Sequence, residues 1–359
     1  MKNFLIFFTL FASIFYVKAQ TDSTQLPLKI KGYLESYYCY DFGKPPNHNR
    51  PAFLYSFNRH NEVNINLGFI KASYEKNNIR ANLGLMTGTY PNANLSSEPG
   101  VLKNTYEGNV GVKLSKNKNI WVDVGLFPSH IGFESAIGKD CWNLTRSILA
   151  ENSPYYESGV KLSSASNNGK WFISGLLLNG WQRIQRVNAN NTPAFGHQLT
   201  FKPNAKVTLN SSSFVGNDKP DSVMQMRYFH NFYGQFQIQK KLGVIIGFDI
   251  GREQKTKNKS EYNSWYSPVF IVKYSLTMKL RIAMRGEYYS DENQVIIATG
   301  THNGFQTYGY SVNIDYSIAE NIMWRVEGRG FTSKDPIFNE NNSVTRQNNF
   351  VTTSLAILF

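Results

Sequence analysis

Charged side chains recur at alternate positions in two segments of the second half of the chain. Residues two apart on a β-strand share a face, so each set would line one wall. Guanidinium and ammonium groups gathered on a wall attract anions and raise their local concentration. The sequence therefore predicts a wall that sorts solutes by charge, with only weak anion preference because carboxylates share it. The residues are Lys279, Arg281, Arg285, Glu287, Arg325, Glu327 and Arg329.

A second group of charges lies in the longest polar segment, residues 129–154. Opposed charges across a narrow point in a pore would set a transverse field that screens solutes by size and polarity. If this segment folds into a pore, its charged residues would form the constriction. The alternative is a solvated surface loop whose charges have no specific role. The candidate residues are Glu134, Lys139, Asp140, Arg146 and Glu151.

The histidines of the chain do not form a recognisable catalytic site. Hydrolysis would need a nucleophile with a base, or a water activated by paired carboxylates and histidine. The six histidines are scattered, and neither a Gly-x-Ser-x-Gly nor a His-Glu-x-x-His pattern occurs. His130 and Glu134 are the one suggestive pair, although a loop histidine is more often structural. The sequence therefore predicts no enzymatic activity, no metal site and no cofactor.

The charged walls require strands, and period-two segments recur along the whole chain. In the final segment, Val351, Leu355 and Phe359 share one face and Thr352 and Ser354 the other. A basic group on a lipid-facing strand costs about 2 to 4 kcal/mol near the membrane midplane, so charged faces must look into water. Sixteen strands are predicted, at residues 29–40, 61–75, 79–90, 106–115, 120–128, 155–163, 171–181, 196–203, 205–214, 226–240, 243–254, 265–275, 277–289, 307–316, 322–332 and 350–359.

The connections between these strands alternate in length. Short turns such as 76–78 and 319–321 join strands into hairpins, and long polar loops fall between the hairpins. The eight long loops and seven short turns suit an even-stranded barrel with both termini in the periplasm and its long loops outside. The sequence therefore predicts an all-β fold, a closed antiparallel transmembrane β-barrel of about 16 strands, rather than a soluble sandwich.

The ends and the composition indicate export to a membrane. A positive start, an apolar run and a small residue at Ala19 predict a secretory signal peptide over 1–19, leaving 20–359 as the barrel. Aromatic residues make up 14% of a chain with mean hydropathy −0.38, which suits an aromatic girdle around a wet interior. Cys39 and Cys141 could form a disulfide in an oxidising compartment, although the sequence does not establish their geometry.

The predicted strand number determines what the barrel can do. Barrels of 16 to 18 strands enclose an aqueous channel, whereas about eight strands leave room only for side chains or one ligand. We therefore expect passive diffusion of small hydrophilic solutes across the outer membrane of a Gram-negative bacterium. The alternative is a surface adhesin or scaffold with a blocked lumen. Nucleic acid is not an expected partner despite the net charge of +13, since basic loop residues can contact acidic lipid headgroups instead.

Three stretches in and after the longest loop resemble the signature of a known family. They are Gly132–Ser135, Trp142–Ser147 and Glu151–Lys161, and the family is the OmpL-like putative beta-barrel porin-2 family. The resemblance extends over most of the mature chain and implies an outer-membrane diffusion porin without a named substrate. Sixteen-stranded porins are commonly trimers, so a homotrimer in outer-membrane lipid is expected by analogy. The signature positions include Glu134, Ser135, Arg146 and Ser147.

Overall fold

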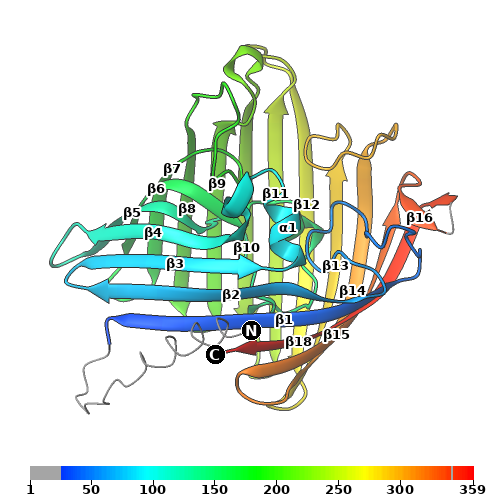
Figure 1. The fold of residues 1–359 in the computed structure, drawn as a ribbon, viewed down its shortest axis with the longest axis horizontal. Helices are drawn as coiled ribbons and strands as arrows, with labels where there is room; N and C mark the ends of the chain where they lie inside the picture. Colours follow the sequence, from blue (N-terminus) through cyan, green and yellow to red (C-terminus); the bar gives the residue numbers. More distant parts are fainter. Residues whose placement is uncertain (1–25, 341–342) are drawn as a thin grey trace, which may run out of the picture.

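Sixteen strands of the described chain form one closed antiparallel barrel (Figure 1). The computed structural model describes residues 26–340 and 343–359, so the predicted signal peptide at 1–19 lies outside the described residues. The first eight strands are β1 (Leu28–Asp41), β2 (Val63–Lys76), β3 (Ile79–Thr87), β4 (Thr105–Lys113), β5 (Asn119–Pro128), β6 (Tyr156–Ala165), β7 (Trp171–Leu178) and β8 (Ala194–Asn204). The other eight are β9 (Val207–Asn217), β10 (Met226–Gln237), β11 (Leu242–Gln254), β12 (Tyr262–Ser275), β13 (Leu280–Asp291), β14 (Phe305–Ser317), β15 (Ile322–Ser333) and β18 (Gln347–Leu358).

The barrel closes because its last strand pairs with its first. β18 runs antiparallel to β1, with Phe350 opposite Asp41 and Leu358 opposite Tyr33. The other strands pair with their neighbours in chain order, with β15 next to β18. Closure leaves no unpaired strand edge in the ring, which a sheet in lipid requires. The predicted closed antiparallel barrel is confirmed, and each predicted segment overlaps one strand of the ring.

Strand boundaries differ from the prediction where the backbone turns. The predicted strand 79–90 ends at Thr87, because Gly88 has a φ of 128° and helix α1 (Thr89–Asn94) follows. Pro203 lies at the end of β8, where the register with β9 shifts. A proline has no N–H to donate to the ladder, so it fits such an irregular position.

The remaining elements are short and lie in the long connections. A small hairpin that the sequence analysis did not predict is formed by β16 (Phe338–Glu340) and β17 (Ser343–Thr345). The helical turns are η1 (Gly100–Asn104), η2 (Gly138–Asp140), α2 (Ile148–Glu151) and η3 (Asp221–Val223). None of the described helices is long and apolar enough to cross a membrane.

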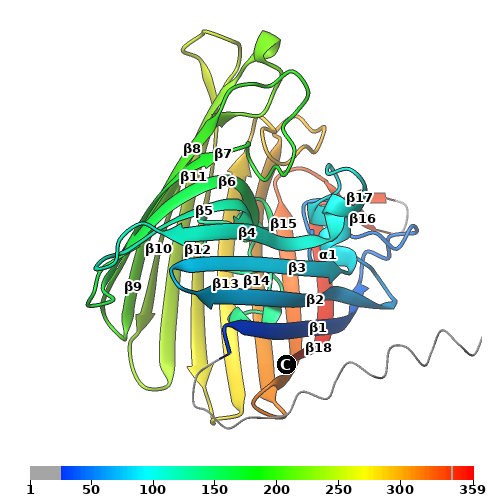
Figure 2. The same ribbon diagram turned by 60° about the vertical axis from the view of Figure 1, so that its left-hand side comes forward.

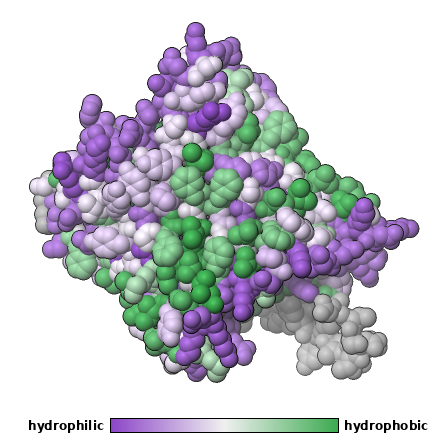
Figure 3. Space-filling view, turned by 180° about the vertical axis from the view of Figure 1, so that it is seen from behind, coloured by the Kyte–Doolittle hydropathy of each residue, from purple (hydrophilic) through white to green (hydrophobic). Residues whose placement is uncertain are grey.

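Burial alternates along the strands as the period-two pattern predicts. In β14, Ser311, Asn313 and Asp315 are buried on the inner face, whereas Tyr310 and Val312 between them are exposed. Seen from behind, hydrophobic side chains gather over the middle of the barrel and hydrophilic ones toward its edges (Figure 3). This is the distribution that an outer wall in contact with lipid requires.

Aromatic rings from three neighbouring strands form a row on the outer wall. Tyr266 of β12 lies 6.0 Å from Tyr288 of β13, and Tyr288 lies 4.4 Å from Tyr308 of β14, measured between ring centroids. Amphipathic rings collect at the boundary between hydrocarbon and headgroups. The row is therefore placed as one girdle of a membrane barrel would be.

The connection between β5 and β6, residues 129–155, lies inside the ring of strands, and we call it loop L3 (Figure 2). Leu144 and Ile148 of L3 are fully buried. They belong to a hydrophobic cluster that also contains Phe53 of the first long loop and Phe331 of β15. The core of the molecule thus includes a loop packed against the inner wall, and the segment 129–154 does enter the lumen.

Candidate functional site: two sides of the barrel lumen

Loop L3 crosses the lumen and reaches the end of the barrel that carries the short turns. Near its start, the N–H of Gly132 donates to Asn231 Oδ1 of β10 at 3.2 Å. At its tip, Lys139 Nζ donates to the backbone oxygen of Glu320, in the turn between β14 and β15, at 2.8 Å. On its return, the N–H of Leu144 donates to Asn313 Oδ1 of β14 at 3.1 Å. The loop therefore divides the interior into two sides.

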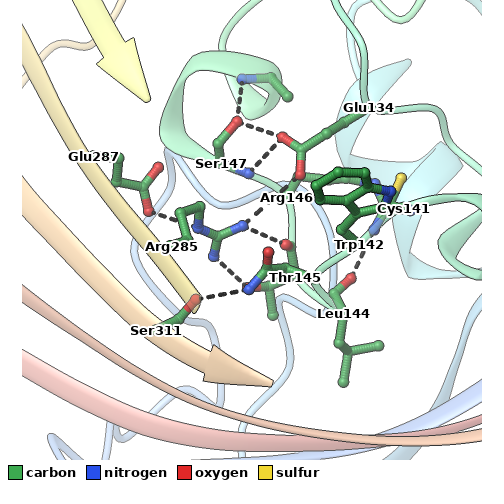
Figure 4. A network of polar contacts seen from close by, with 12 residues as sticks. Glu134, Cys141, Trp142, Leu144, Thr145, Arg146, Ser147, Arg285, Glu287 and Ser311 are labelled. Atoms are coloured by element: carbon green, nitrogen blue, oxygen red, sulfur yellow. Dashed lines mark hydrogen bonds and ion pairs between the residues drawn. The ribbon is translucent and has the colours of Figure 1, made fainter. Parts of the chain in front are cut away.

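The signature residues of L3 bind one another. The N–H of Ser147 donates to Glu134 Oε2 at 2.9 Å, and the hydroxyl of Ser147 donates to the same oxygen. Arg146 Nε donates to the backbone oxygen of Ser135 at 2.7 Å, and its other nitrogens donate to two further loop carbonyls. These four residues clasp the descending and returning limbs of the loop together. Figure 4 shows Glu134, Arg146 and Ser147 of this set.

A buried network of ion pairs fixes the returning limb of L3 to β13 and β15. Arg285 Nη2 lies 3.0 Å from Glu327 Oε1, and Arg285 Nε lies 3.2 Å from Glu287 Oε1. Arg329 Nη2 lies 2.5 Å from the same oxygen of Glu287. Removing such charges from water is costly unless further hydrogen bonds add to the ion pairs. In this network the loop backbone supplies the additional partners.

The backbone of L3 adds hydrogen bonds to these wall charges. Arg285 Nη1 donates to the oxygen of Thr145 at 2.7 Å, and the N–H of Thr145 donates to Glu327 at 2.5 Å. The N–H of Ile148 donates to Glu287 Oε2 at 2.6 Å. Several of these contacts meet at the turn of the loop in Figure 4. Charge-assisted bonds to a backbone are strong and directional, so they hold the loop in the lumen and fix its position there.

Arg325 makes a separate attachment nearer the tip of the loop. Its Nε lies 2.6 Å from Asp315 Oδ1 of β14. Its Nη1 donates to the oxygen of Gly138 at 2.6 Å, and its Nη2 donates to the oxygen of Cys141 at 3.0 Å. The tip is thus held by an arginine whose charge is already balanced.

The expectation that the charged wall faces water is wrong for most of its residues. Arg285, Glu287, Arg325, Glu327 and Arg329 do lie on the inner face, but all five are buried beneath L3. Alternation along a strand identifies the face of a residue but not what covers that face. The two remaining predicted wall residues lie near the short-turn end: Lys279 is exposed and Arg281 is half-buried.

The loop charges do not face one another across a gap. Glu134 and Arg146 are buried in the clasp. Glu151 is buried in α2, where it accepts hydrogen bonds from the N–H groups of Tyr55 at 3.0 Å and Ser56 at 3.2 Å. Burial raises the pKa of Glu151 from its ordinary value to about 7. Of the five predicted constriction residues, only Asp140 is exposed.

Two other suggestions from the sequence are resolved by contacts. Cys39 and Cys141 are both free and buried, so the suggested disulfide is wrong. Cys39 accepts a hydrogen bond from Thr352, and Cys141 donates to backbone oxygens of L3. His130 Nε2 lies 2.8 Å from the backbone oxygen of Ser213, and burial lowers the pKa of His130 to about 4. Glu134 is bound to Ser147 instead. His130 and Glu134 therefore do not form the acid–base pair that their spacing suggested.

The other side of L3 borders a chamber of about 730 Å³ that extends toward the short-turn end. Inward residues of β3, β4 and β6–β10 form its outer boundary. Half-buried rings and neutral polar groups line most of it, and they include Tyr106, Phe133, Phe172, Gln198, Tyr233 and Gln235. Lys170 and Lys202 lie at the short-turn end, and Asp140 projects from the loop. No charge network like that of β13 and β15 fills this space in the described part of the chain.

A smaller cavity of about 240 Å³ lies on the long-loop side. Between the two cavities, three loops meet in a seam formed by Asn94, Glu98, Tyr155 and Gln182. Gln182 Nε2 donates to the oxygen of Asn94 at 3.2 Å, and Gln182 Oε1 accepts from the N–H of Tyr155 at 2.8 Å. Glu98 accepts from the N–H of Ile184 at 2.9 Å. Sequence reasoning missed this seam because polar residues in irregular loops have no periodic signal.

The comparisons with known proteins agree with this geometry. The family model described as "Putative beta-barrel porin-2, OmpL-like" matches residues 27–359. No curated protein matches the sequence. Among solved structures, the trimer form of OmpT from Vibrio cholerae has a TM-score of 0.59 at 9% identity, covering 92% of this chain and 99% of that one.

Two further solved structures have similar folds. An anion-selective porin from Comamonas acidovorans has a TM-score of 0.60 at 8% identity and covers 92% of this chain and 99% of that chain. The outer membrane channel DcaP of Acinetobacter baumannii has a TM-score of 0.57 at 9% identity, covering 92% and 97%. At these identities the likeness establishes the fold, while the family model covers nearly all of the described chain.

Proposed function

Because this chain belongs to the OmpL-like putative beta-barrel porin-2 family and is an outer-membrane porin, we propose that solutes cross it on one side of L3 only. Small hydrophilic solutes would diffuse past the aromatic and amide groups of the chamber, through the seam, and out between the long loops. The observation that supports this route is the chamber of about 730 Å³ opposite the anchored limb. On the anchored side the charged wall residues of β13 and β15 are buried against the loop.

We propose that selectivity is weak and favours anions. Glu134 lines the chamber, but its charge is engaged with Ser147 and lies 3.8 Å from Arg285. Among the described residues that line the chamber, the charges left to act on a passing ion are those of Lys170, Lys202 and Asp140. Two cations against one anion raise the local anion concentration modestly. The buried wall arginines, which the sequence suggested for this role, would contribute little because each is paired.

A planar bilayer experiment tests the selectivity. Under a KCl gradient, the reversal potential of the natural protein should indicate weak anion preference. Replacing both Lys170 and Lys202 with Gln should remove that preference or reverse it, because Asp140 then acts alone. Lys279→Gln is the matched control, since Lys279 is exposed at the same end and does not line the chamber. Clear cation preference in the natural protein would contradict the proposal.

One observation favours a second candidate, a surface adhesin or scaffold with a blocked lumen. The seam joins three loops by hydrogen bonds between the two cavities. If these bonds never open, the barrel would expose its loops without conducting. Conductance separates the candidates: stepwise current increases support the porin, and silence across many insertions supports the adhesin.

We also propose that residues 1–19 direct export and that the mature chain assembles as a homotrimer in outer-membrane lipid. The apolar outer wall supports the membrane placement. The trimer proposal is supported by a similar barrel, OmpT, whose solved structure is described as a trimer form. The mass of the protein in mild detergent would test the assembly, and the amino-terminal residue of the protein from outer membranes would test the cleavage.

A further inference from the structure

Another cavity, of about 380 Å³, lies among the long loops. Its lining residues come from the first long loop (42–62), from the connection between β13 and β14 (292–304) and from β16. Asp41 at the end of β1 and Asn348 at the start of β18 also line it. None of the described residues lines both this cavity and the chamber or the smaller cavity beside the seam. We call it the loop cavity.

Buried carboxylates hold the loops around this cavity in shape. Asp291 accepts hydrogen bonds from three consecutive N–H groups, those of residues 295–297, at 2.7 to 2.9 Å. Asp335, in the segment after β15, accepts from the N–H and from Nδ2 of Asn303, both at 2.8 Å. These bonds tie two of the contributing loops together. The loop cavity is therefore preformed, as binding sites for small molecules usually are, and a ligand would not have to order the loops.

Three buried side chains that line the cavity have hydrogen-bonding capacity that the protein does not use. Asp41, Arg50 and Asn348 are 1%, 5% and 4% exposed. In the described part of the chain, four of their atoms have no hydrogen-bond partner: Asp41 Oδ2, Arg50 Nε, Arg50 Nη2 and Asn348 Oδ1. Leaving such atoms unpaired inside a protein costs free energy. A ligand that supplied the missing partners would recover that cost.

The other atoms of these side chains fix their positions. Arg50 Nη1 donates to the backbone oxygen of Phe57 at 2.9 Å, and the guanidinium carbon lies 3.6 Å from the centre of the Phe350 ring. Asn348 Nδ2 donates to Asp41 Oδ1 at 2.7 Å. Arg50 Nε lies 3.5 Å from Asp41 Oδ2, so the two charges balance each other. The unused donors and acceptors thus have set positions, and together these three side chains carry no net charge.

The unused groups indicate the chemistry of the ligand. They are two donors on one guanidinium and two oxygen acceptors. A hydroxyl group both donates and accepts, so a ligand with neighbouring hydroxyls can satisfy both kinds. A carboxylate could only accept and would meet the charge of Asp41, whereas an ammonium group could only donate and would meet the charge of Arg50. The balanced pair therefore favours a neutral, hydroxylated ligand.

The remaining lining suits the same ligand. Neutral polar residues contribute further hydrogen-bonding groups, and apolar residues offer surface against which C–H groups can pack. The polar residues are Asn47, Asn49, Thr299 and Asn339, and the apolar ones include Phe53, Ile297, Phe305 and Ile337. Sugars present both hydroxyl and C–H groups on one small ring, and so match both parts of this lining.

We propose that the loop cavity binds a small neutral sugar on the outside of the cell. Its volume lies within the range of about 300 to 1,000 Å³ that is usual for small-molecule sites. The long loops of an outer-membrane barrel are external, so the ligand would come from the medium. This site goes beyond the proposed diffusion route, and it stands whether or not the barrel conducts.

Calorimetric titration of the full chain in detergent tests the proposal. Glucose, galactose, maltose and lactose are the neutral probes, and glutamate and free lysine are the charged ones. At least one sugar should bind at one site per chain, and neither charged probe should bind. Ala298→Trp should abolish this binding, because Ala298 is exposed and lines the cavity, which the larger ring would fill. His302→Trp is the matched control, since His302 is exposed on the same connection and does not line the cavity.

A second variant separates the shape of the guanidinium from its charge. Arg50→Lys retains a positive charge beside Asp41 but lacks the planar set of donors. It should weaken sugar binding at least tenfold, while circular dichroism still reports a folded barrel. Unchanged affinity in the folded Arg50→Lys variant, tighter binding of glutamate than of any sugar, or no binding by any of the sugars would overturn the proposal. Sugar binding that survives Ala298→Trp would also overturn it, because the sugar would then occupy another part of the barrel.

Discussion

The two sides of L3 differ in a way that separates anchoring from transport. Toward β13 and β15, Arg285, Glu287, Glu327 and Arg329 are buried and bind each other and the loop backbone. Toward β3, β4 and β6–β10, rings and amides border an open chamber. The richest charge pattern in the sequence therefore marks where the loop is fixed. The solute route lies along the wall whose sequence is chemically plainer.

The anchored side explains why the loop holds one position. A buried ion pair by itself adds little net stability, because removing charges from water costs about as much as their attraction returns. The benefit here is specificity, since the carboxylates and guanidinium groups accept only a backbone that presents N–H and C=O groups at matching positions. The clasp between Glu134 and Ser147 gives the loop that shape.

Breaking the anchored side should produce the largest effect. Arg285→Met leaves Glu327 and Glu287 short of a partner inside the barrel, which should lower the free energy of unfolding by about 3 to 5 kcal/mol. Release of L3 should also raise the single-channel conductance. Arg281→Met on the same strand is the control, because Arg281 is half-buried and its Nη2 donates to the sulfur of Met323 at 3.6 Å rather than to a carboxylate. Equal unfolding midpoints in denaturant for the two variants would contradict the anchoring role.

The second largest effect is expected in how the free energy of unfolding depends on pH. Burial raises the pKa of Glu151 from 4.5 to about 7. Because the folded-state value is the higher one, the stabilisation is complete below pH 4.5 and is lost as the pH rises through 7, a change of about 3 kcal/mol. Glu151→Gln should remove this dependence and raise the melting temperature at pH 8. Thermal unfolding at pH 5 and pH 8 measures it, and a natural protein more stable at pH 8 would argue against the assignment.

Opening the seam should show whether it limits the passage of solutes on the chamber side of L3. Gln182→Ala removes hydrogen bonds to Asn94 and Tyr155, each worth about 1 kcal/mol, and should raise conductance without unfolding the barrel. Gln185→Ala is the matched control, since its side chain is exposed and only its backbone N–H contacts Glu98. If both variants conduct like the natural protein, the seam does not limit passage.

The smallest effect is expected at Tyr155. Its hydroxyl is buried and has no hydrogen-bond partner in the described chain. Tyr155→Phe therefore removes an unpaired polar group, which should stabilise the protein by about 1 kcal/mol or less. Tyr156→Phe is the comparison, because the hydroxyl of Tyr156 does donate to Glu98, at 3.4 Å. Urea unfolding distinguishes them, and greater loss of stability at Tyr155 would mean that its hydroxyl has a partner.

The fold was predictable from the sequence to a greater extent than the site was. Period-two alternation depends on which face is buried, so it located every strand of the ring, including the closing segment around Val351 and Leu355. It could not show that L3 covers the inner face of β14, because Ser311 and Asn313 would be polar under a loop or under water. The seam at Gln182 depends on contacts between distant loops, which leave no local pattern.

Accessibility of the two walls to a reagent is the most direct test of the account. Gln235→Cys on the chamber wall and Ser311→Cys beneath L3 are compared in single channels, using a charged methanethiosulfonate. Gln235 lines the chamber, whereas Ser311 is buried and accepts a hydrogen bond from Asn143 at 3.2 Å. We predict that the reagent lowers the current through the Gln235→Cys channel and leaves the Ser311→Cys channel unchanged. The reverse result would place the route along the anchored wall and contradict the account.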